Sequence, residues 1–208
     1  IQITPNVTTQ LSTTEYGALG SAANDDSKFF YGAKTDGGID IIDGSSGSWT
    51  FTPIVSAEAY VYRTLKGFRV GGAGSRTMMA ARAAPGGLDY FKEVAGWSNT
   101  NMMDTAPRNF SAITVNSNLA TDQAWVGPET AGDYRGAGTS GVEGYNNGTI
   151  TSLKLSGKLY PDLAHGHVVN GDTIDLFYGA GPAGLDFYRG GSGGGDSQIN
   201  ANVYNSIT

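Results

Sequence analysis

The chain has 208 residues, a formal net charge of −6 and no cysteine, and these facts exclude several classes of protein. The acidic balance leaves no basic footprint for nucleic acid or anionic lipid, so no nucleic-acid partner is expected. Without cysteine there is no disulfide framework, no thiolate chemistry and no cysteine-based zinc site. No run of about 18 apolar residues is present, so no membrane-spanning helix is expected.

The composition is rich in glycine and poor in charge. Glycine contributes 32 residues and charged residues only 15% of the chain, against about 25% charged residues in an average domain. A surface built from Ser, Thr, Asn, Gln and Gly lacks the like-charge repulsion that keeps copies of a protein apart. This composition favours a homo-oligomer, or a subunit that packs against other subunits of one assembly.

Residues 1–27 are polar and weakly patterned, which predicts an extended N-terminal arm with at most one edge strand. The chain begins at Ile1 rather than Met, as processing or a trimmed chain would both produce. The apolar residues of this arm that are expected to contact neighbouring subunits are Ile1, Ile3 and Val7.

Alternating apolar residues predict strands in the next two segments. In residues 28–44, an aromatic cluster and an isoleucine-rich run flank an Asp-Gly-Gly turn. In residues 48–70, Trp49 and Phe51 alternate with threonine, and Pro53 marks an edge strand or a bulge.

Residues 76–94 form the only segment with helical character. The run Thr-Met-Met-Ala-Ala-Arg-Ala-Ala has high helix propensity, and a Pro-Gly-Gly stops it. One or two short helices are therefore predicted here. Residues 96–141 are rich in Asn, Thr and Gly and are predicted to be long loops, with one clear strand over 110–115.

Residues 149–189 carry the strongest strand pattern. Three alternating runs, separated by Gly, Pro and Asn-Gly, predict consecutive strands of an antiparallel sheet. The glycine-rich residues 190–196 indicate a hinge that leads into a C-terminal arm. The apolar residues of that arm that are expected to pair with a neighbouring subunit are Ile199, Val203 and Ile207.

These patterns together predict a single mainly-β domain over residues 1–208. The expected fold is an antiparallel β-sandwich or jelly roll with long loops and one or two short helices. Extended arms are expected over about 1–27 and about 190–208. No internal repeat of fixed period is found, and no motif is specific to a known family.

His165 and His167 are the only histidines and form the best candidate for a metal site. Alternate residues of a strand point the same way, so both imidazoles could bind one ion. A third ligand would come from Asp162, Asp172 or Asp175. Two histidines that flank a glycine are more often exposed loop residues, and no cofactor is predicted.

Catalytic constellations are not recognisable, so the chain is predicted not to be an enzyme. No pair of carboxylates is placed for glycoside hydrolysis, since Glu58, in a predicted strand, has no second acid two residues on. Glycan binding needs only exposed aromatic platforms, although large aromatics are more often core residues. The candidate platforms are Trp97, Trp125, Tyr134 and Tyr145.

The leading hypothesis is a non-enzymatic structural subunit of a repetitive viral or extracellular assembly, such as a capsid, decoration, tail or surface-filament protein. Such a protein would be located in a virion or at the cell surface. The alternative is a carbohydrate-binding module or adhesin that uses loop aromatics. A third hypothesis is a glycan-active enzyme on the same β-sandwich.

Overall fold

The structure is a computed structural model. It describes residues 10–21, 28–54, 57, 59–69, 76–83, 85–93, 97–101, 108–116, 123–130, 133, 140–146, 149–155, 157–165, 176–189 and 195–207. Within these ranges the regular structure is β-strand, and no described residue lies in an α-helix. No helix in the described part of the chain has the length and apolar character needed to cross a membrane.

The described strands form four separate antiparallel sheets, each made of four consecutive strands. Sheet A contains β1 (Tyr16–Ser21), β2 (Phe29–Lys34), β3 (Ile39–Asp43) and β4 (Thr50–Pro53). Sheet B contains β5 (Tyr62–Arg69), β6 (Arg76–Arg82), β7 (Leu88–Glu93) and β8 (Trp97–Asn101). Sheet C contains β9 (Phe110–Asn116), β10 (Gln123–Pro128), β11 (Val142–Asn146) and β12 (Thr149–Lys154). Sheet D contains β13 (Asp162–His165), β14 (Leu176–Gly181), β15 (Gly184–Arg189) and β16 (Gly195–Asn200).

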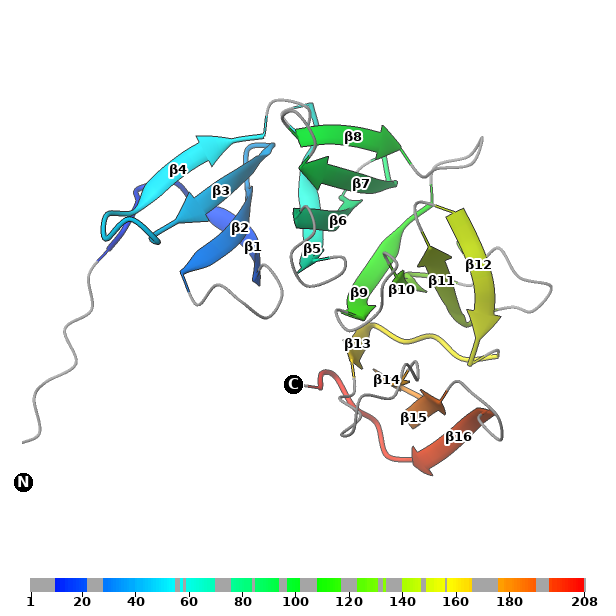
Figure 1. Cartoon of the computed structure of the whole chain (residues 1–208). Coiled ribbons are helices and arrows are strands. Elements are labelled where there is room, and N and C mark those ends of the chain that lie inside the picture. The colour runs from blue at the N-terminus through cyan, green and yellow to red at the C-terminus, as the bar shows by residue number, and fades with distance from the viewer. Residues whose placement is uncertain are drawn as a thin grey trace, which may run out of the picture.

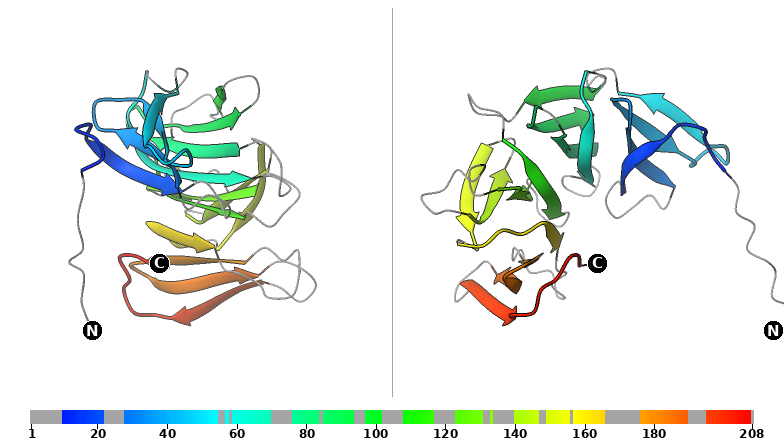
Figure 2. Two further views of the ribbon diagram at one scale, coloured as in Figure 1. Left: turned by 60° about the vertical axis from the view of Figure 1, so that its left-hand side comes forward. Right: turned by 180° about the vertical axis from the view of Figure 1, so that it is seen from behind.

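The four sheets follow one another in an open arc (Figure 1), and the two further views show the same order (Figure 2). A sandwich or jelly roll has two large sheets that share one core, with strands from distant parts of the chain. Here every sheet is a local up-and-down meander that pairs only with its chain neighbours. The expectation of a mainly-β antiparallel fold is confirmed, and the expectation of a sandwich or jelly roll is wrong.

Glycine allows the short hairpins that make each sheet local. The β2–β3 turn contains Gly37 and Gly38, with φ of 116° and 89°. The β6–β7 turn contains Gly86 and Gly87, with φ of 95° and 133°. Other residues rarely adopt these left-handed conformations, so the paired glycines fix where each hairpin reverses.

The helix expected in residues 76–94 is absent, because this segment forms β6 and β7. Met78 and Ala80 belong to the core shared with sheet A, whereas Met79 and Ala81 belong to the core shared with sheet C. A strand buried on both faces is apolar throughout and loses the alternating pattern that reveals a half-exposed strand. Tertiary burial here overrides the helix propensity of the run.

Three hydrophobic cores join the four sheets. The core between sheets A and B comprises Phe29, Tyr31, Ala33, Ile39, Ile54, Ala57, Tyr62, Leu65, Met78, Ala80 and Phe91. The core between sheets B and C comprises Met79, Ala81, Leu88, Tyr90, Phe110, Ile113, Ala124, Val126 and Tyr145. The core between sheets C and D comprises Ala112, Trp125, Val142, Leu155, Tyr160, Leu163 and Phe177. Each inner sheet is therefore covered on both faces by neighbouring sheets, and each end sheet packs against one other described sheet.

The C-terminal segment folds back onto sheet D. Residues 195–200 form β16, which pairs with β15 of the same chain. Beyond it, the backbone N–H of Tyr204 donates to the Gly181 carbonyl at 3.2 Å, and that of Ile207 donates to Asp162 Oδ2 at 2.7 Å. Residues 201–207, here called the strap, lie on the side of sheet D that faces away from sheet C (Figures 1 and 2).

Close approach of the sheets leaves no room for a side chain at Gly127 in β10. A Cβ atom there would overlap the carbonyl oxygen of Tyr160, a backbone atom that cannot rotate away. Gly127→Ala is expected to lower the free energy of unfolding by about 1–3 kcal/mol, measured by urea denaturation. Gly17→Ala is the matched control, because its Cβ would meet only the Thr35 side chain, at 3.7 Å. Equal destabilisation by the two variants would contradict this packing.

Candidate functional site

Each sheet carries one buried acidic residue near the start of its third strand. Asp40, Asp89, Glu143 and Asp186 occupy these positions and are at most 7% exposed. Each follows a glycine and one aliphatic residue: Gly-Ile-Asp, Gly-Leu-Asp, Gly-Val-Glu and Gly-Leu-Asp. The chain therefore contains a short repeated motif at unequal intervals, although no repeat of fixed period is present.

Each of these carboxylates accepts a hydrogen bond from a tyrosine hydroxyl and forms an ion pair with a lysine or an arginine. The tyrosine hydroxyls donate at 2.8–3.0 Å, in the pairs Tyr16–Asp40, Tyr62–Asp89, Tyr145–Glu143 and Tyr160–Asp186. The cations form the ion pairs Lys34–Asp40, Arg82–Asp89, Arg108–Glu143 and Lys158–Asp186. A buried carboxylate is tolerated only when it is paired and hydrogen-bonded in this way.

The clusters differ in how tightly the cation is held. In sheet B, Arg82 binds Asp89 with two hydrogen bonds of 2.6 and 2.7 Å, and both side chains are buried. In sheet A, the Lys34 ammonium lies 3.6 Å from the Asp40 carboxylate and is partly exposed. A bidentate buried pair is the stronger interaction, because water screens the exposed one.

In sheets B, C and D, each cluster faces the preceding sheet. Leu88 and Tyr90 belong to the core shared with sheet C, so Asp89 between them points toward sheet A. Val142 belongs to the core shared with sheet D, so Glu143 points toward sheet B. Asp186 pairs in register with Gly179, which lies under the Tyr160 ring in the core between sheets C and D.

In sheet A, the same cluster lies on a face that no other described sheet covers. Tyr31 and Ile39 point into the core shared with sheet B, so Phe30 and Asp40 point away from it. We call this surface the free face of sheet A. It also carries Leu19, which pairs with Gly32 and is 65% exposed.

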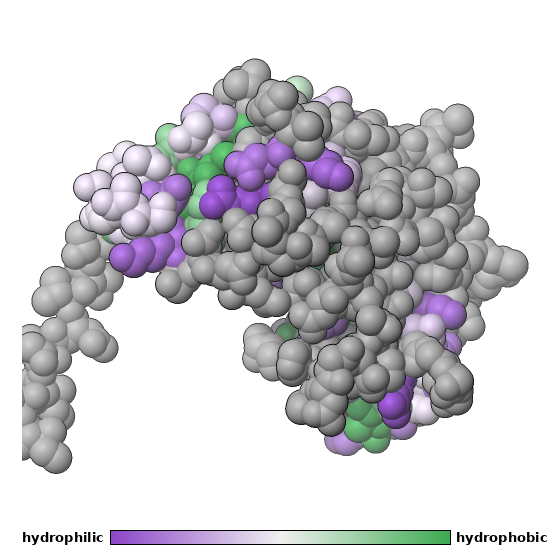
Figure 3. All heavy atoms as spheres, in the orientation of Figure 1, coloured by the Kyte–Doolittle hydropathy of each residue, from purple (hydrophilic) through white to green (hydrophobic). Residues whose placement is uncertain are grey.

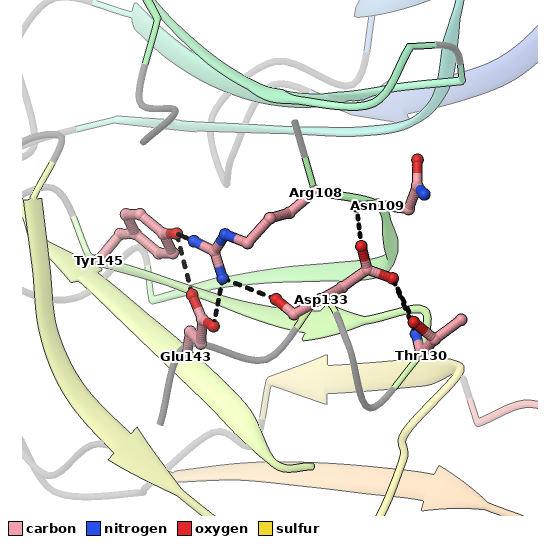
Figure 4. A network of polar contacts seen from close by, with 6 residues as sticks. All are labelled: Arg108, Asn109, Thr130, Asp133, Glu143 and Tyr145. Carbon is pink, nitrogen blue, oxygen red and sulfur yellow. Dashed lines mark hydrogen bonds and ion pairs between the residues drawn. The ribbon is translucent and has the colours of Figure 1, made fainter. Parts of the chain in front are cut away.

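The cluster of sheet C extends into a larger network (Figure 4). Arg108 donates to Glu143, to the Tyr145 hydroxyl at 3.1 Å and to the Asp133 carbonyl at 2.7 Å. The Asp133 carboxylate accepts the Asn109 N–H at 2.8 Å and the Thr130 hydroxyl at 2.6 Å. This network fixes part of the connection between β10 and β11 to the start of β9.

The cluster of sheet D borders a cleft of about 230 Å³ between sheets C and D. Lys158 donates to both Asp186 oxygens, at 2.8 and 3.0 Å. The residues that line the cleft are Leu155, Lys158, Tyr160, Asp186, Asp196, Ser197 and Gln198. The cleft therefore combines a buried ion pair with polar groups from the edge strand β16.

Burial and the neighbouring carboxylate raise the pKa of all four cluster tyrosines. Burial is the largest cause in each, followed by the carboxylate that accepts the hydroxyl. The pKa of Tyr16 rises to about 12, and those of Tyr62, Tyr145 and Tyr160 rise further. These hydroxyls therefore stay protonated at neutral pH and act as hydrogen-bond donors.

The aromatic residues expected to form glycan platforms do not form an exposed surface. Trp125 is 2% exposed and stacks on Phe177 with ring centroids 4.5 Å apart, so it is a core residue. Tyr145 is buried in the network of sheet C. Trp97 begins β8, but its side chain lies outside the described residues, as does Tyr134 entirely.

The expected metal site is not assembled in the described part of the chain. His165 ends β13 and is partly buried, where it pairs in register with Phe177. His167, Asp172 and Asp175 lie outside the described residues. Among the residues that the structure describes, no group of three His, Cys, Asp or Glu side chains is placed to bind one ion.

The terminal residues expected to make assembly contacts are only partly described. Ile1, Ile3 and Val7 lie outside the described residues, whereas residues 16–21 of the expected arm form β1. Ile199 is exposed in β16, Val203 is exposed in the strap, and Ile207 is partly buried there.

Comparison with solved structures shows that the four sheets are blades of a β-propeller. The structure described as the Dos1 propeller matches with a TM-score of 0.58 and 14% identity, covering 92% of this chain and 49% of that one. The WD40 β-propeller domain of Doa1 matches with a TM-score of 0.41 and 9% identity, covering 94% of this chain and 71% of that one, a similarity too low to carry an argument. This chain thus spans about half the length of the Dos1 propeller chain. No protein-family model and no curated protein matches the chain.

This finding overturns the functional expectations that depended on a sandwich or jelly roll. The chain resembles propeller domains, not capsid or jelly-roll proteins, so the hypothesis of a viral or extracellular structural subunit is wrong. The carbohydrate-binding alternative is wrong for the same reason, and two of its platforms are buried. The expected location in a virion or at the cell surface depended on that hypothesis and is therefore wrong as well.

The clusters predict how stability depends on pH. A tyrosine whose pKa is raised in the folded state stabilises the fold fully below its unfolded value of about 10, and this stabilisation is lost as pH rises through the folded value. The free energy of unfolding should therefore fall between pH 10 and about 12, the folded value of Tyr16. In Tyr16→Phe the fall across this window, measured by urea denaturation, should be smaller. An unchanged fall in the variant would contradict the coupling of Tyr16 to Asp40.

Proposed function

We propose that this chain is a non-enzymatic protein-interaction scaffold made of propeller blades, and that the free face of blade A (sheet A) receives the partner. The observation that supports this is the repeated cluster. In blades B, C and D the carboxylate, tyrosine and cation are covered by the preceding blade. In blade A the same cluster stands on a face that no described blade covers, so this face has the construction of an interface.

The apolar residues around this cluster support the same conclusion. Phe30, Ile42 and Phe51 pair across β2, β3 and β4 and share the free face. The Trp49 ring lies 6.2 Å from that of Phe30, and Trp49 is more than one-third exposed. Hydrophobic residues reach the surface over blade A in Figure 3. An apolar patch with aromatic residues at its centre and polar groups at its rim is the usual anatomy of a protein interface.

The chemistry of the clusters supports a binding role rather than catalysis. Each of the four cluster carboxylates is occupied by a cation and by a tyrosine hydroxyl that donates to it, and the buried Asp133 carboxylate is occupied by the Asn109 N–H and the Thr130 hydroxyl. An acid or base must be free to exchange a proton with substrate, and a nucleophile needs an adjacent base. These clusters instead join strands within one blade. The fold by itself does not decide function.

Leu19→Asp tests the free face, because this side chain is exposed and its replacement should not unfold the protein. A photo-crosslinking residue at position 19 would capture the partner from the source cell, and the captured protein would then be purified. Its affinity for the chain, measured by calorimetry, should fall at least about tenfold with Leu19→Asp, since a charge would be desolvated in the interface.

Val61→Asp is the matched control, because Val61 is also an exposed aliphatic residue but precedes blade B. It should leave both the affinity and the melting temperature unchanged. Equal loss of affinity in the two variants, or a purified protein that binds Leu19→Asp as tightly as the wild type, would contradict the proposal.

A further inference from the structure

The cleft between blades C and D has the properties of a second binding site, separate from the free face of blade A. Its floor contains Asp186, which is 4% exposed and is held by Lys158 and the Tyr160 hydroxyl. Its outer wall is β16, the edge strand of blade D, whose residues are exposed. The cleft thus joins a buried charged group to an accessible rim.

Asp196 places a second carboxylate at the same cleft. Its Oδ2 accepts the backbone N–H of Leu155 at 3.1 Å, which aims the side chain toward blade C. No described lysine or arginine forms an ion pair with Asp196, whereas Lys158 is already engaged by Asp186. Asp196 lines the same cleft as Tyr160 and Asp186.

The rim offers hydrogen-bond acceptors. The Gln198 amide N–H₂ donates to the Ala183 carbonyl at 3.0 Å, which leaves the Gln198 amide oxygen as an acceptor. Gln198 shares a register row with Asp186 and therefore points to the same face. Ser197 pairs in register with Phe187, so its side chain points to the opposite face. A ligand that matches these groups must donate several hydrogen bonds.

The volume of the cleft limits the size of the ligand. At about 230 Å³ it is smaller than the roughly 300–1,000 Å³ of pockets for drug-sized molecules. The lining carries two carboxylates and one ammonium, so the lining itself has a net negative charge, and the Lys154 ammonium lies nearby over the Tyr188 ring, which pairs in register with Asp196. We propose that this cleft binds a single basic side chain, a guanidinium or an ammonium group, presented by a protein.

Guanidinium fits the geometry best. It carries five N–H donors in a rigid fork and is weakly hydrated, so it exchanges water for a carboxylate and neutral acceptors at low cost. The Asp196 carboxylate would form the charged contact, and the Gln198 amide oxygen would accept a further donor. Lys158 stays paired with Asp186 at the floor of the cleft.

The test uses a short glycine–serine peptide with one central arginine, titrated into the full chain and followed by nuclear magnetic resonance. Shifts should be confined to residues of β16 and the segment 155–160, and binding should weaken as salt is raised. The same peptide with glutamine in place of arginine should not bind. Asp196→Asn should weaken arginine-peptide binding at least about tenfold, because the amide keeps the Leu155 contact and removes only the charge.

Asp43→Asn is the matched control. Asp43 also accepts a backbone N–H with its side chain, from Ser45 at 2.8 Å, and lies in blade A far along the chain from the cleft. It should leave the affinity for the arginine peptide unchanged. Equal binding of the arginine and glutamine peptides, preferential binding of a glutamate peptide, or an unchanged affinity in Asp196→Asn would each overturn the proposal.

These outcomes are independent of the free face. A chain that ignores the arginine peptide but binds a protein through Leu19 would keep the proposed function and lose only this site. A chain that binds the arginine peptide but no protein at blade A would keep the cleft site and contradict the proposed function.

Discussion

Each blade junction of this protein is built around a carboxylate that is buried and must be paired. Desolvation of an unpaired carboxylate would cost several kcal/mol, so Asp89, Glu143 and Asp186 require their tyrosine and cation partners in place before the blades can close. The hydrophobic cores provide most of the attraction between blades, but they are not directional. The clusters add direction, because hydroxyl and guanidinium donors reach the carboxylate in only one arrangement of the strands. The strand arrangement inside each blade therefore depends on these polar contacts, and the packing of blade on blade depends on apolar burial.

Each of the two proposed sites lies beside one of these carboxylate clusters. At the first blade the cluster of Asp40 lies on a free face, and at the last junction the cluster of Asp186 lies beside an open cleft. At the far end of the arc the strap covers part of blade D through Tyr204 and Ile207. The two ends of the arc are thus unlike: one is partly covered by the chain itself, and the other carries the free face that we propose as an interface.

Part of this structure could be predicted from the sequence. The apolar alternation at 28–44, 110–115 and 149–189 correctly indicated antiparallel strands, and the glycine pairs marked their turns. The helix prediction for segment 76–82 was wrong because a strand buried on both faces has no alternation, and the Met-Ala composition of this segment favours a helix in isolation. The predicted sandwich or jelly roll was wrong because alternation does not reveal which strands pair. The Gly-aliphatic-acid motif was the missing signal: it occurs once per blade, but unequal connections within the blades, long between β10 and β11 and short between β14 and β15, hide its period. Burial of Trp125 and Tyr145 was not visible from residue type.

The most direct test of the account is a double-mutant cycle at the junction between blades A and B. The free energies of unfolding of Arg82→Met, Asp89→Asn and the double variant would be measured by urea denaturation. The account predicts a coupling energy of at least about 1 kcal/mol between these buried partners, and less than about 0.5 kcal/mol in the same cycle on Lys34 and Asp40, where the cation is partly exposed. Additive effects at Arg82 and Asp89 would contradict the claim that the paired carboxylates fix the strand arrangement inside each blade.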